Sequence, residues 1–309
     1  MDKYHFIISS RAGKGSNEKL IEKLEKNLPL GIKYEMYVTE HENHVRDICR
    51  EVKTENIGKV IVCGGDGTVN EAANELAGSD VPMGVIPTGT GNDFSRSIYG
   101  DMKLTEIISR IDRLVPSPID LIYVEITGTD TYKGYAVNVI SLGLDSLILK
   151  TALEIKDRNP WMKGNSYFLA IIKCLPKIEL LDLKIVYKDI NAKSHEISEK
   201  MILGSICNGR YYGNGFNPNP NGILDDGINE ICFLKDTPLF EILPLILKYR
   251  KGNHLGSERL LLENTIEGEV SMDDGEFLSN VDGIVYSCNK IKWRVSKNKL
   301  NLLQLRKII

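Results

Sequence analysis

The feature that most constrains the fold is a short apolar segment that runs directly into a glycine-rich turn. Val60–Cys63 is followed by Gly64-Gly65-Asp66-Gly67-Thr68. A continuous apolar run of this length is typical of a parallel strand that is buried on both faces. Apolar residues then recur at helical spacing over Val69–Leu76. The segment therefore predicts a strand, a tight turn and a helix, which is the repeating unit of an open parallel sheet.

The same alternation extends over the first third or so of the chain. We predict strands at Phe6–Ile8 and Val85–Ile86, and helices at Asn17–Asn27 and Thr105–Leu114. After Pro116-Ser117-Pro118 the pattern changes, and strand signals dominate. The later predicted strands are Leu121–Ile126, Tyr135–Ile140, Leu183–Tyr187, Met201–Cys207, Ile228–Leu234 and Ile284–Ser287, with helices near Asn165–Leu175 and Leu239–Arg250.

These elements predict an α/β plus β protein of two domains, and a length of 309 residues agrees with two hydrophobic cores. Residues 1–122 are expected to form an N-terminal open parallel-sheet α/β domain. Residues 123–295 are expected to form a C-terminal antiparallel β-sandwich domain that holds the substrate. Residues 296–309 are expected to return to the first domain.

Charge and cysteine usage exclude several classes of function. The chain has 39 basic and 42 acidic residues, so no basic excess indicates nucleic acid as a partner. Its six cysteines lie far apart and form no CxxC pair, which argues against a zinc ribbon or a disulfide framework. No segment approaches the about 18 apolar residues of a membrane span, and the polar N-terminus does not resemble a signal peptide. We therefore expect a cytoplasmic protein.

A second glycine-rich segment, Pro87–Phe94, follows the next predicted strand and reads PTGTGNDF. Ligands of open α/β sheets bind at the carboxyl ends of the strands, where glycines and helix N-termini accommodate phosphate. A carboxylate such as Asp66 beside a phosphate indicates Mg²⁺ or general-base chemistry. A lone GGDG turn with a capping aspartate would be an equally good interpretation, but two such loops predict one nucleotide site. Its expected contacts are Gly64, Gly65, Gly67, Thr68, Thr88, Gly89, Thr90 and Asn92.

Together, the GGDGT and GTGNDF segments resemble the diacylglycerol kinase catalytic-domain family, which includes bacterial lipid kinases and sphingosine and ceramide kinases. GGDGT alone also occurs in NAD kinases and phosphofructokinases, and GTGNDF favours the lipid-kinase branch. The resemblance implies an enzyme that uses ATP and Mg²⁺ to phosphorylate a lipid hydroxyl, with diacylglycerol as the leading acceptor. The lipid would be reached at the bilayer surface by peripheral membrane association, and a homodimer is left open.

The resemblance also implies roles for acids later in the chain. Asp274-Gly275-Glu276 resembles the family's late DGE motif, whose aspartate is a candidate base for the lipid hydroxyl. Glu276 is expected among the nucleotide contacts. We favour Asp274 as the base and Asp66 as the organiser of phosphate and Mg²⁺, although the two could exchange roles. Asp120 matches a family acid of the Mg²⁺ and water network.

Two further sites are predicted from residues outside the two glycine-rich segments and the DGE motif. Asp225 and Asp226 follow a glycine-rich loop, and paired carboxylates suit a cation, although an Asp-Asp-Gly turn explains them equally well. By resemblance they hold a structural Mg²⁺. Lys14 matches a basic residue near the phosphates, but the chain departs from the family here. Ser9-Ser10 stands where the family usually has Asn-Pro.

Other interpretations remain open at this level. An NAD kinase-type or other small-molecule kinase would share GGDGT and the two-domain plan. Another lipid, such as phosphatidylglycerol or a sphingoid base, could be the acceptor. A nucleotide-binding regulator without catalysis is the third alternative. For membrane contact, Leu239–Leu247 with the basic residues after it and Trp161-Met162-Lys163 are candidates, and a core helix with a basic end competes with the first of them.

Overall fold

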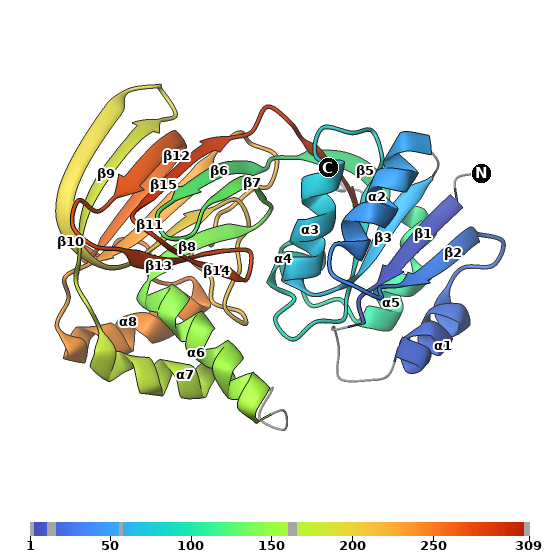
Figure 1. Ribbon diagram of the computed structural model, residues 1–309, viewed down its shortest axis with the longest axis horizontal. Helices are drawn as coiled ribbons and strands as arrows, with labels where there is room; N and C mark the ends of the chain where they lie inside the picture. The colour runs from blue at the N-terminus through green and yellow to red at the C-terminus, as the bar shows by residue number, and fades with distance from the viewer. Residues whose placement is uncertain (1–2, 11–16, 56–57, 160–165, 306–309) are drawn as a thin grey trace. The chain divides into compact units, whose positions relative to one another are not determined.

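The structure is a computed structural model that describes residues 3–10, 17–55, 58–159 and 166–305 (Figure 1). The chain divides into two compact units. Unit 1 comprises Met1–Asp120 and Lys297–Ile309, and unit 2 comprises Leu121–Ser296.

Unit 1 is built on a six-stranded sheet with the order β2-β1-β3-β4-β16-β5. The four strand pairs from β2 to β16 are parallel, whereas the last pair, β16 with β5, is antiparallel. The α/β class predicted for this region is confirmed, with an antiparallel edge strand as a difference. The strands are β1 (Lys3–Ile8), β2 (Lys33–Val38), β3 (Lys59–Gly64), β4 (Met83–Pro87), β5 (Val115–Ile119) and β16 (Leu300–Gln304).

The helices of unit 1 follow the strands in alternation. They are α1 (Asn17–Asn27), α2 (His44–Glu55), α3 (Asp66–Leu76), α4 (Asp93–Tyr99) and α5 (Leu104–Ser109), with a 3₁₀ turn η1 (Ile111–Arg113). The helix predicted at Thr105–Leu114 is therefore too long. Its last part tightens into 3₁₀ geometry, since the backbone N–H of Arg110 donates to the carbonyl of Ile107, three residues back.

Unit 2 is built on an antiparallel sheet with the order β14-β13-β8-β10-β11-β12-β15-β6-β7, and β9 pairs with both β10 and β12. This confirms the predicted antiparallel β domain. Its core contains Phe233 and Trp293, and Gly204 makes room for the Phe233 ring, which a Cβ on Gly204 would approach to 2.3 Å. The strands are β6 (Ile122–Thr127), β7 (Tyr132–Ala136), β8 (Val139–Gly143), β9 (Leu181–Asp189), β10 (Ser194–Cys207), β11 (Asn229–Lys235), β12 (Leu260–Ser271), β13 (Phe277–Val281), β14 (Ile284–Cys288) and β15 (Lys290–Val295).

The single strand predicted at Tyr135–Ile140 is instead the end of β7 and the start of β8. The carboxylate of Asp282 accepts hydrogen bonds from the backbone N–H groups of Val137, Asn138 and Val139, at 2.6, 3.1 and 2.9 Å. These amides therefore bond to a side chain, and the strand breaks at this point. The sequence pattern of apolar residues carries no sign of this distant carboxylate.

The two ends of the unit 2 sheet meet. The backbone N–H of Asp130, in the β6–β7 turn, donates to the carbonyl of Ser287 at 2.9 Å, and the N–H of Ser287 donates to the Asp130 carboxylate at 2.7 Å. The rings of Tyr132 and Tyr286 lie 5.3 Å apart. The terminal strands β7 and β14 thus join, and the sheet folds over a common core.

Three helices cover one part of the unit 2 sheet (Figure 1). They are α6 (Leu144–Arg158), α7 (Ser166–Cys174), which continues into a 3₁₀ turn η3 (Leu175–Lys177), and α8 (Leu239–Lys251). Side chains of all three share one apolar core with residues of β8, β10 and β11. Among the described residues no helix has the length and hydropathy needed to cross a membrane.

Candidate functional site

The two glycine-rich loops of unit 1 leave the carboxyl ends of neighbouring parallel strands. Gly64 pairs with Pro87 in the β3–β4 register, and the Thr88 backbone N–H donates to the carbonyl of Gly64 at 3.1 Å. The loops then touch at Gly65 and Gly89. A Cβ on Gly89 would lie 2.5 Å from the Gly65 Cα, so this contact requires glycine. The structure thus brings together the two loops that the sequence indicated separately.

Asp66 connects the first loop to the second. It is the first residue of α3, and its Oδ1 accepts a hydrogen bond from the backbone N–H of Phe94 at 3.1 Å. Burial raises the pKa of the Asp66 carboxyl, while the backbone N–H groups of Phe94 and Asp93 act in the opposite direction. The first turn of α4 and the Asp66 carboxylate therefore hold each other in place.

A second carboxylate, Asp93, lies beside Asp66. A Cβ placed on Gly91 would lie 3.0 Å from Asp66 Oδ2 and 3.3 Å from Asp93 Oδ2, so both groups flank the same point of the loop. Asp93 is buried, and Arg96 donates to its Oδ1 at 3.3 Å. Asp93 was not among the predicted site residues. Its position in GTGNDF, directly after Asn92, was the signal that could have found it.

Two buried polar atoms of the second loop have no hydrogen-bond partner among the described residues, namely Thr88 Oγ1 and Asn92 Oδ1. Asn92 has a left-handed backbone with φ of 56°, and its Nδ2 donates to the carbonyl of Gly89 at 2.9 Å. Buried polar groups nearly always form a hydrogen bond to the protein, to water or to a ligand. A threonine hydroxyl and backbone amides at a glycine loop can bind phosphate oxygens. The arrangement therefore suits a phosphate-containing ligand.

The remaining predicted residues of these loops lie close by but differ in environment. Thr68 packs over Gly64, where a Cβ would lie 2.6 Å from the Thr68 Cβ. Gly67 and Thr90 are exposed, and a Cβ on Gly67 would meet no atom within 4 Å. Lys14 lies outside the described residues, as does the Trp161-Met162-Lys163 segment.

Asp120 lies at the end of β5 in unit 1 and is fully buried. Its carboxylate forms an ion pair with Lys299, which directly precedes β16. This pair ties two strands that neighbour each other in the sheet but are far apart in the sequence. Sequence reasoning missed Lys299 because nothing near Asp120 in the chain signals a partner so distant.

The DGE motif lies in unit 2, in the loop between β12 and β13. Asp274 is exposed, and Gly275 has a φ of +92°. Both carboxylate oxygens of Glu276 are bonded within the unit: the Thr129 backbone N–H donates to Oε1 at 2.6 Å, and the Ser287 hydroxyl donates to Oε2 at 2.7 Å. These two donors hold the pKa of Glu276 below its ordinary value. Glu276 therefore fastens the β6–β7 turn to β14.

Asp225 and Asp226 lie in the turn before β11, and both are exposed. The Ile228 backbone N–H donates to Asp226 Oδ1 at 3.1 Å. Nearby in the chain, burial raises the pKa of Glu230 to about 7, and Asn219 Nδ2 donates to its carboxylate at 2.7 Å. Within the described part of the chain, no three His, Cys, Asp or Glu side chains gather in a way that would hold a metal ion by themselves.

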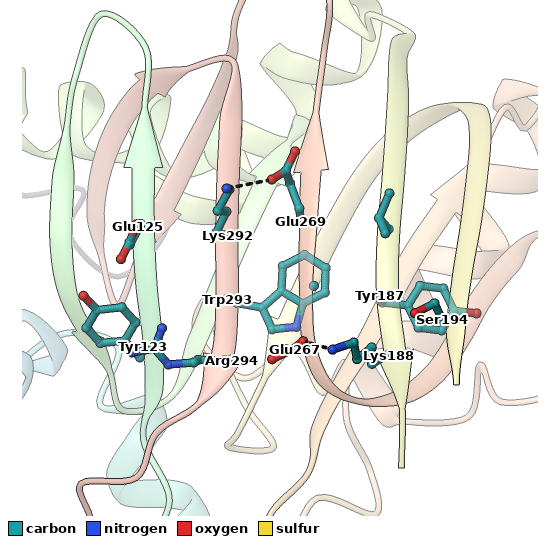
Figure 2. A pocket seen from close by; sticks show the side chains of 12 residues that line it. Tyr123, Glu125, Tyr187, Lys188, Ser194, Glu267, Glu269, Lys292, Trp293 and Arg294 are labelled. Carbon is teal, nitrogen blue, oxygen red and sulfur yellow. Dashed lines mark ion pairs between the residues drawn. The ribbon is translucent and has the colours of Figure 1, made fainter. Parts of the chain in front are cut away.

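A pocket of about 310 Å³ lies on the unit 2 sheet, over strands β6, β15, β12 and β9 (Figure 2). Gly268 makes space there, since a Cβ would lie 2.3 Å from the Trp293 ring. The charged groups at its rim are paired, with Lys188 2.7 Å from Glu267 and Lys292 3.2 Å from Glu269 (Figure 2). None of the predicted site residues lines this pocket. We therefore place the candidate site at the β3 and β4 loops.

Comparison with known proteins shows which families the two parts of the chain resemble. Residues 3–124 match the family model of the diacylglycerol kinase catalytic domain, and residues 138–304 match that of the YegS C-terminal NAD kinase beta sandwich-like domain. The chain therefore belongs to the family that carries the YegS C-terminal NAD kinase beta sandwich-like domain, and its N-terminal segment matches the diacylglycerol kinase catalytic domain. In this family member, the matched N-terminal segment contains both glycine-rich loops.

Individual relatives of this family member are distant. A diacylglycerol kinase of Mycobacterium tuberculosis is 30% identical over 198 residues, which cover 63% of this chain and 61% of that protein. A diacylglycerol kinase of Bacillus subtilis is 24% identical over 290 residues, which cover 92% of this chain and 90% of the relative. A solved diacylglycerol kinase structure from Bacillus anthracis has a TM-score of 0.70 at 19% identity, covering 100% of this chain and 98% of the other. That last likeness shows the shared fold.

Proposed function

We propose that this chain is an ATP-dependent lipid kinase that transfers the γ-phosphoryl group to the hydroxyl of diacylglycerol, which yields phosphatidic acid. The observation that carries the proposal is the contact of the two glycine loops at Gly65 and Gly89, with Asp66 bonded into the second loop. Family membership supports kinase chemistry. The M. tuberculosis and B. subtilis relatives are diacylglycerol kinases, which supports diacylglycerol as the acceptor.

In this proposal the two loops bind the phosphates of ATP. Backbone N–H groups of Gly64–Thr68 and the start of α3 supply hydrogen-bond donors, and Thr88 Oγ1 supplies another from the second loop. The orphaned Thr88 and Asn92 oxygens fit this role because each would gain a partner from the bound nucleotide or its water. Lys14, Thr90 and Glu276 are proposed as further nucleotide contacts by family resemblance.

The residues present also fit a magnesium ion at the loops. Mg²⁺ in phosphoryl-transfer sites usually takes one or two carboxylates, with phosphate oxygens and water as its other ligands. Asp66, with Asp93 beside it, supplies such carboxylates without a larger protein cluster. When bound, the ion neutralises charge on the phosphates. A second, structural ion is proposed at Asp225 and Asp226.

For the transfer step we propose Asp274 as the group that accepts the proton of the lipid hydroxyl. The hydroxyl oxygen then forms a bond to the γ-phosphorus while the bond to ADP breaks. Because this transition state is loose, positioning and charge neutralisation contribute most of the catalysis. Asp120 is proposed to support the Mg²⁺ and water network from β5.

A direct assay tests the proposal against the alternatives. Purified protein is incubated with labelled ATP, Mg²⁺ and one acceptor at a time, and the products are separated by thin-layer chromatography. The acceptors are diacylglycerol, phosphatidylglycerol, sphingosine, ceramide and NAD. We expect label on diacylglycerol that disappears in Asp66→Asn. Label on NAD alone would overturn the lipid-kinase proposal, and ATP binding without label on any acceptor would indicate a regulator.

A further inference from the structure

Helix α8 of unit 2 is apolar on the side that faces solvent. Its inward side chains, Ile242, Leu245 and Tyr249, are buried in the core that the helices share with the sheet. The opposite side exposes four large apolar side chains. Their exposed fractions are 52% for Leu239, 75% for Phe240, 50% for Leu243 and 65% for Leu247. A surface helix normally carries polar residues there, so the core of this unit does not explain these positions.

The exposed side chains form two rows along the helix, and each row ends in a lysine. Positions four residues apart lie on one face of a helix. Leu239, Leu243 and Leu247 lead to Lys251, and Phe240 leads through Pro244 to Lys248. All of these positions are exposed. The face formed by Leu239, Phe240, Leu243, Leu247, Lys248 and Lys251, which we call the α8 face, is thus apolar at one end and positive at the other.

The other charged residues of α8 are engaged elsewhere. Glu241 accepts two hydrogen bonds from the guanidinium of Arg259, both at 2.9 Å, so its charge is compensated. The guanidinium of Arg250 lies 5.8 Å from the centre of the Phe216 ring. The α8 face therefore carries positive charge from Lys248 and Lys251 without an acid within its own rows.

Helix α7, which packs on the same core, also carries exposed apolar side chains. Phe168 is 62% exposed and Ile172, four residues later, is 52% exposed. The exposed lysines Lys173 and Lys177 follow at the C-terminal end. Two helices of one unit thus each expose large apolar side chains and have lysines at the C-terminal end.

We propose that the α8 face docks on an anionic lipid bilayer. The apolar side chains would lie at the boundary of headgroups and acyl chains, while the lysine stems extend along them and place their ammonium groups among the headgroup phosphates. This inference rests on the proposed function, because it names the surface from which a lipid kinase would obtain its substrate.

Charge favours an anionic bilayer, rather than a second copy of the chain, as the partner of the α8 face. A two-fold symmetric contact places the same patch of both copies in one interface. The α8 faces would then bring four lysines, two from each copy, into an interface to which the faces contribute no acid. An anionic bilayer neutralises these lysines instead.

Vesicle flotation in the absence of ATP tests the proposal. The full chain is mixed with vesicles of phosphatidylcholine alone or with about one third phosphatidylglycerol, and the bound fraction is measured at low and high salt. We expect binding to the anionic vesicles that weakens with salt. Phe240→Ser with Leu247→Ser, and separately Lys248→Glu with Lys251→Glu, should each reduce binding at least about tenfold.

Matched variants elsewhere in unit 2 serve as controls. Lys193→Glu with Lys200→Glu changes the net charge equally at exposed positions of the β9–β10 hairpin. Ile190→Ser with Ile223→Ser removes two apolar side chains that are 54% and 49% exposed. Both control variants should bind vesicles as the unmodified chain does. Equal losses in controls and α8 variants would overturn the assignment to this helix.

Activity on a short-chain diacylglycerol dissolved as monomers separates this inference from the proposed function. The α8 variants should retain that activity while losing vesicle binding. If the unmodified chain phosphorylates no lipid yet floats through the α8 face, the kinase proposal fails and the docking surface stands. If light scattering shows a dimer that the α8 variants convert to monomers, with vesicle binding unchanged, the face is a contact between copies and the docking proposal fails.

Discussion

At the scale of single residues, the candidate site depends on a contact that only glycine permits. A methyl group on Gly89 would lie 2.5 Å from the Gly65 Cα, whereas one on Gly67 would meet nothing within 4 Å. We expect Gly89→Ala to lower the free energy of unfolding by about 1–3 kcal/mol, the usual effect of overpacking. Gly67→Ala, the matched control at a helical position of α3, should unfold at an unchanged or slightly higher denaturant concentration.

Urea unfolding of both variants checks this prediction, and ATP titration adds a second measurement. We expect both variants to bind ATP more weakly, because the proposed phosphates lie against both glycines. A Gly89→Ala protein as stable as the original would show that the two loops can separate without cost. The glycine contact would then not define the site.

The assignment of the base is a separate prediction at this scale. Asp274→Asn keeps the shape of the side chain but removes its ability to accept a proton. We expect turnover to fall by about 10²–10⁴, which is the usual contribution of a general base, while ATP affinity stays the same. Asp273→Asn, the neighbouring exposed acid, should keep most activity. Near-normal turnover in Asp274→Asn would transfer the role of base to Asp66.

The sequence predicted the loop residues better than their partners. Gly65, Asp66 and Gly89 could be identified because glycine and an acid at a strand end carry a local signal. Asp120 was identified, but its ion-pair partner Lys299 was not, since 179 positions separate them in the chain. The hydrogen bonds to the two carboxylate oxygens of Glu276 could not be predicted from the sequence either, because their donors come from two other strand ends.

At the scale of secondary-structure elements, Glu276 closes the unit 2 sheet by linking the β6–β7 turn to β14. Its pKa is lowered in the folded state by the Ser287 hydroxyl and the Thr129 amide. A group with a depressed folded pKa stabilises the fold above its unfolded pKa, and this contribution is lost as the pH falls through the folded pKa. The link should therefore contribute fully at neutral pH and disappear under acid conditions.

Thermal unfolding over a pH series tests this link. We expect Glu276→Gln to lower the Tm at pH 7, and the difference from the unmodified chain should shrink as the pH falls below about 4, the ordinary pKa range of a glutamate. Glu179→Gln, at an exposed position before β9, should show no such trend. A Tm difference that stays constant with pH would mean that the lost interaction does not depend on the charge of Glu276.

Helices were predicted correctly where their apolar residues fall on one face of the helix. The predicted helix Asn17–Asn27 has the same bounds as α1. Helix α6, by contrast, was missed, because its apolar residues are spread around the helix and its buried face includes the polar residues Asp145 and Ser146. Burial raises the pKa of Asp145 to about 6, and the Tyr167 hydroxyl donates to its carboxylate at 3.1 Å. A buried acid of this kind hides the periodicity that identifies a helix.

At the scale of the whole molecule, unit 1 is built from two distant parts of the chain. Strand β16 lies between β4 and β5, and Leu300, Leu302 and Leu303 are fully buried. Burying three such side chains is worth about 5–9 kcal/mol, which is comparable with the total stability of a typical domain. We expect a chain that ends at Ser296 to lose the fold of unit 1 and keep that of unit 2.

Hydrogen exchange would check this outcome strand by strand. Amides of β1, β3 and β4 should lose their protection in the shortened chain, while those of β10 and β11 keep theirs. A control chain that ends at Leu305 retains β16 and should behave as the full chain does. Protection of β3 and β4 without β16 would show that the first part of the chain is a complete folding unit.

The place of β16 in the sheet also sets an order of events during synthesis. The ribosome produces every strand of unit 2 before residues 300–304 have left the exit tunnel. Until then, β4 and β5 lack the strand that lies between them, although both were translated much earlier. The N-terminal segment that carries the glycine loops therefore lacks the last strand of its own sheet until synthesis is nearly complete. During that time it is accessible to chaperones and proteases.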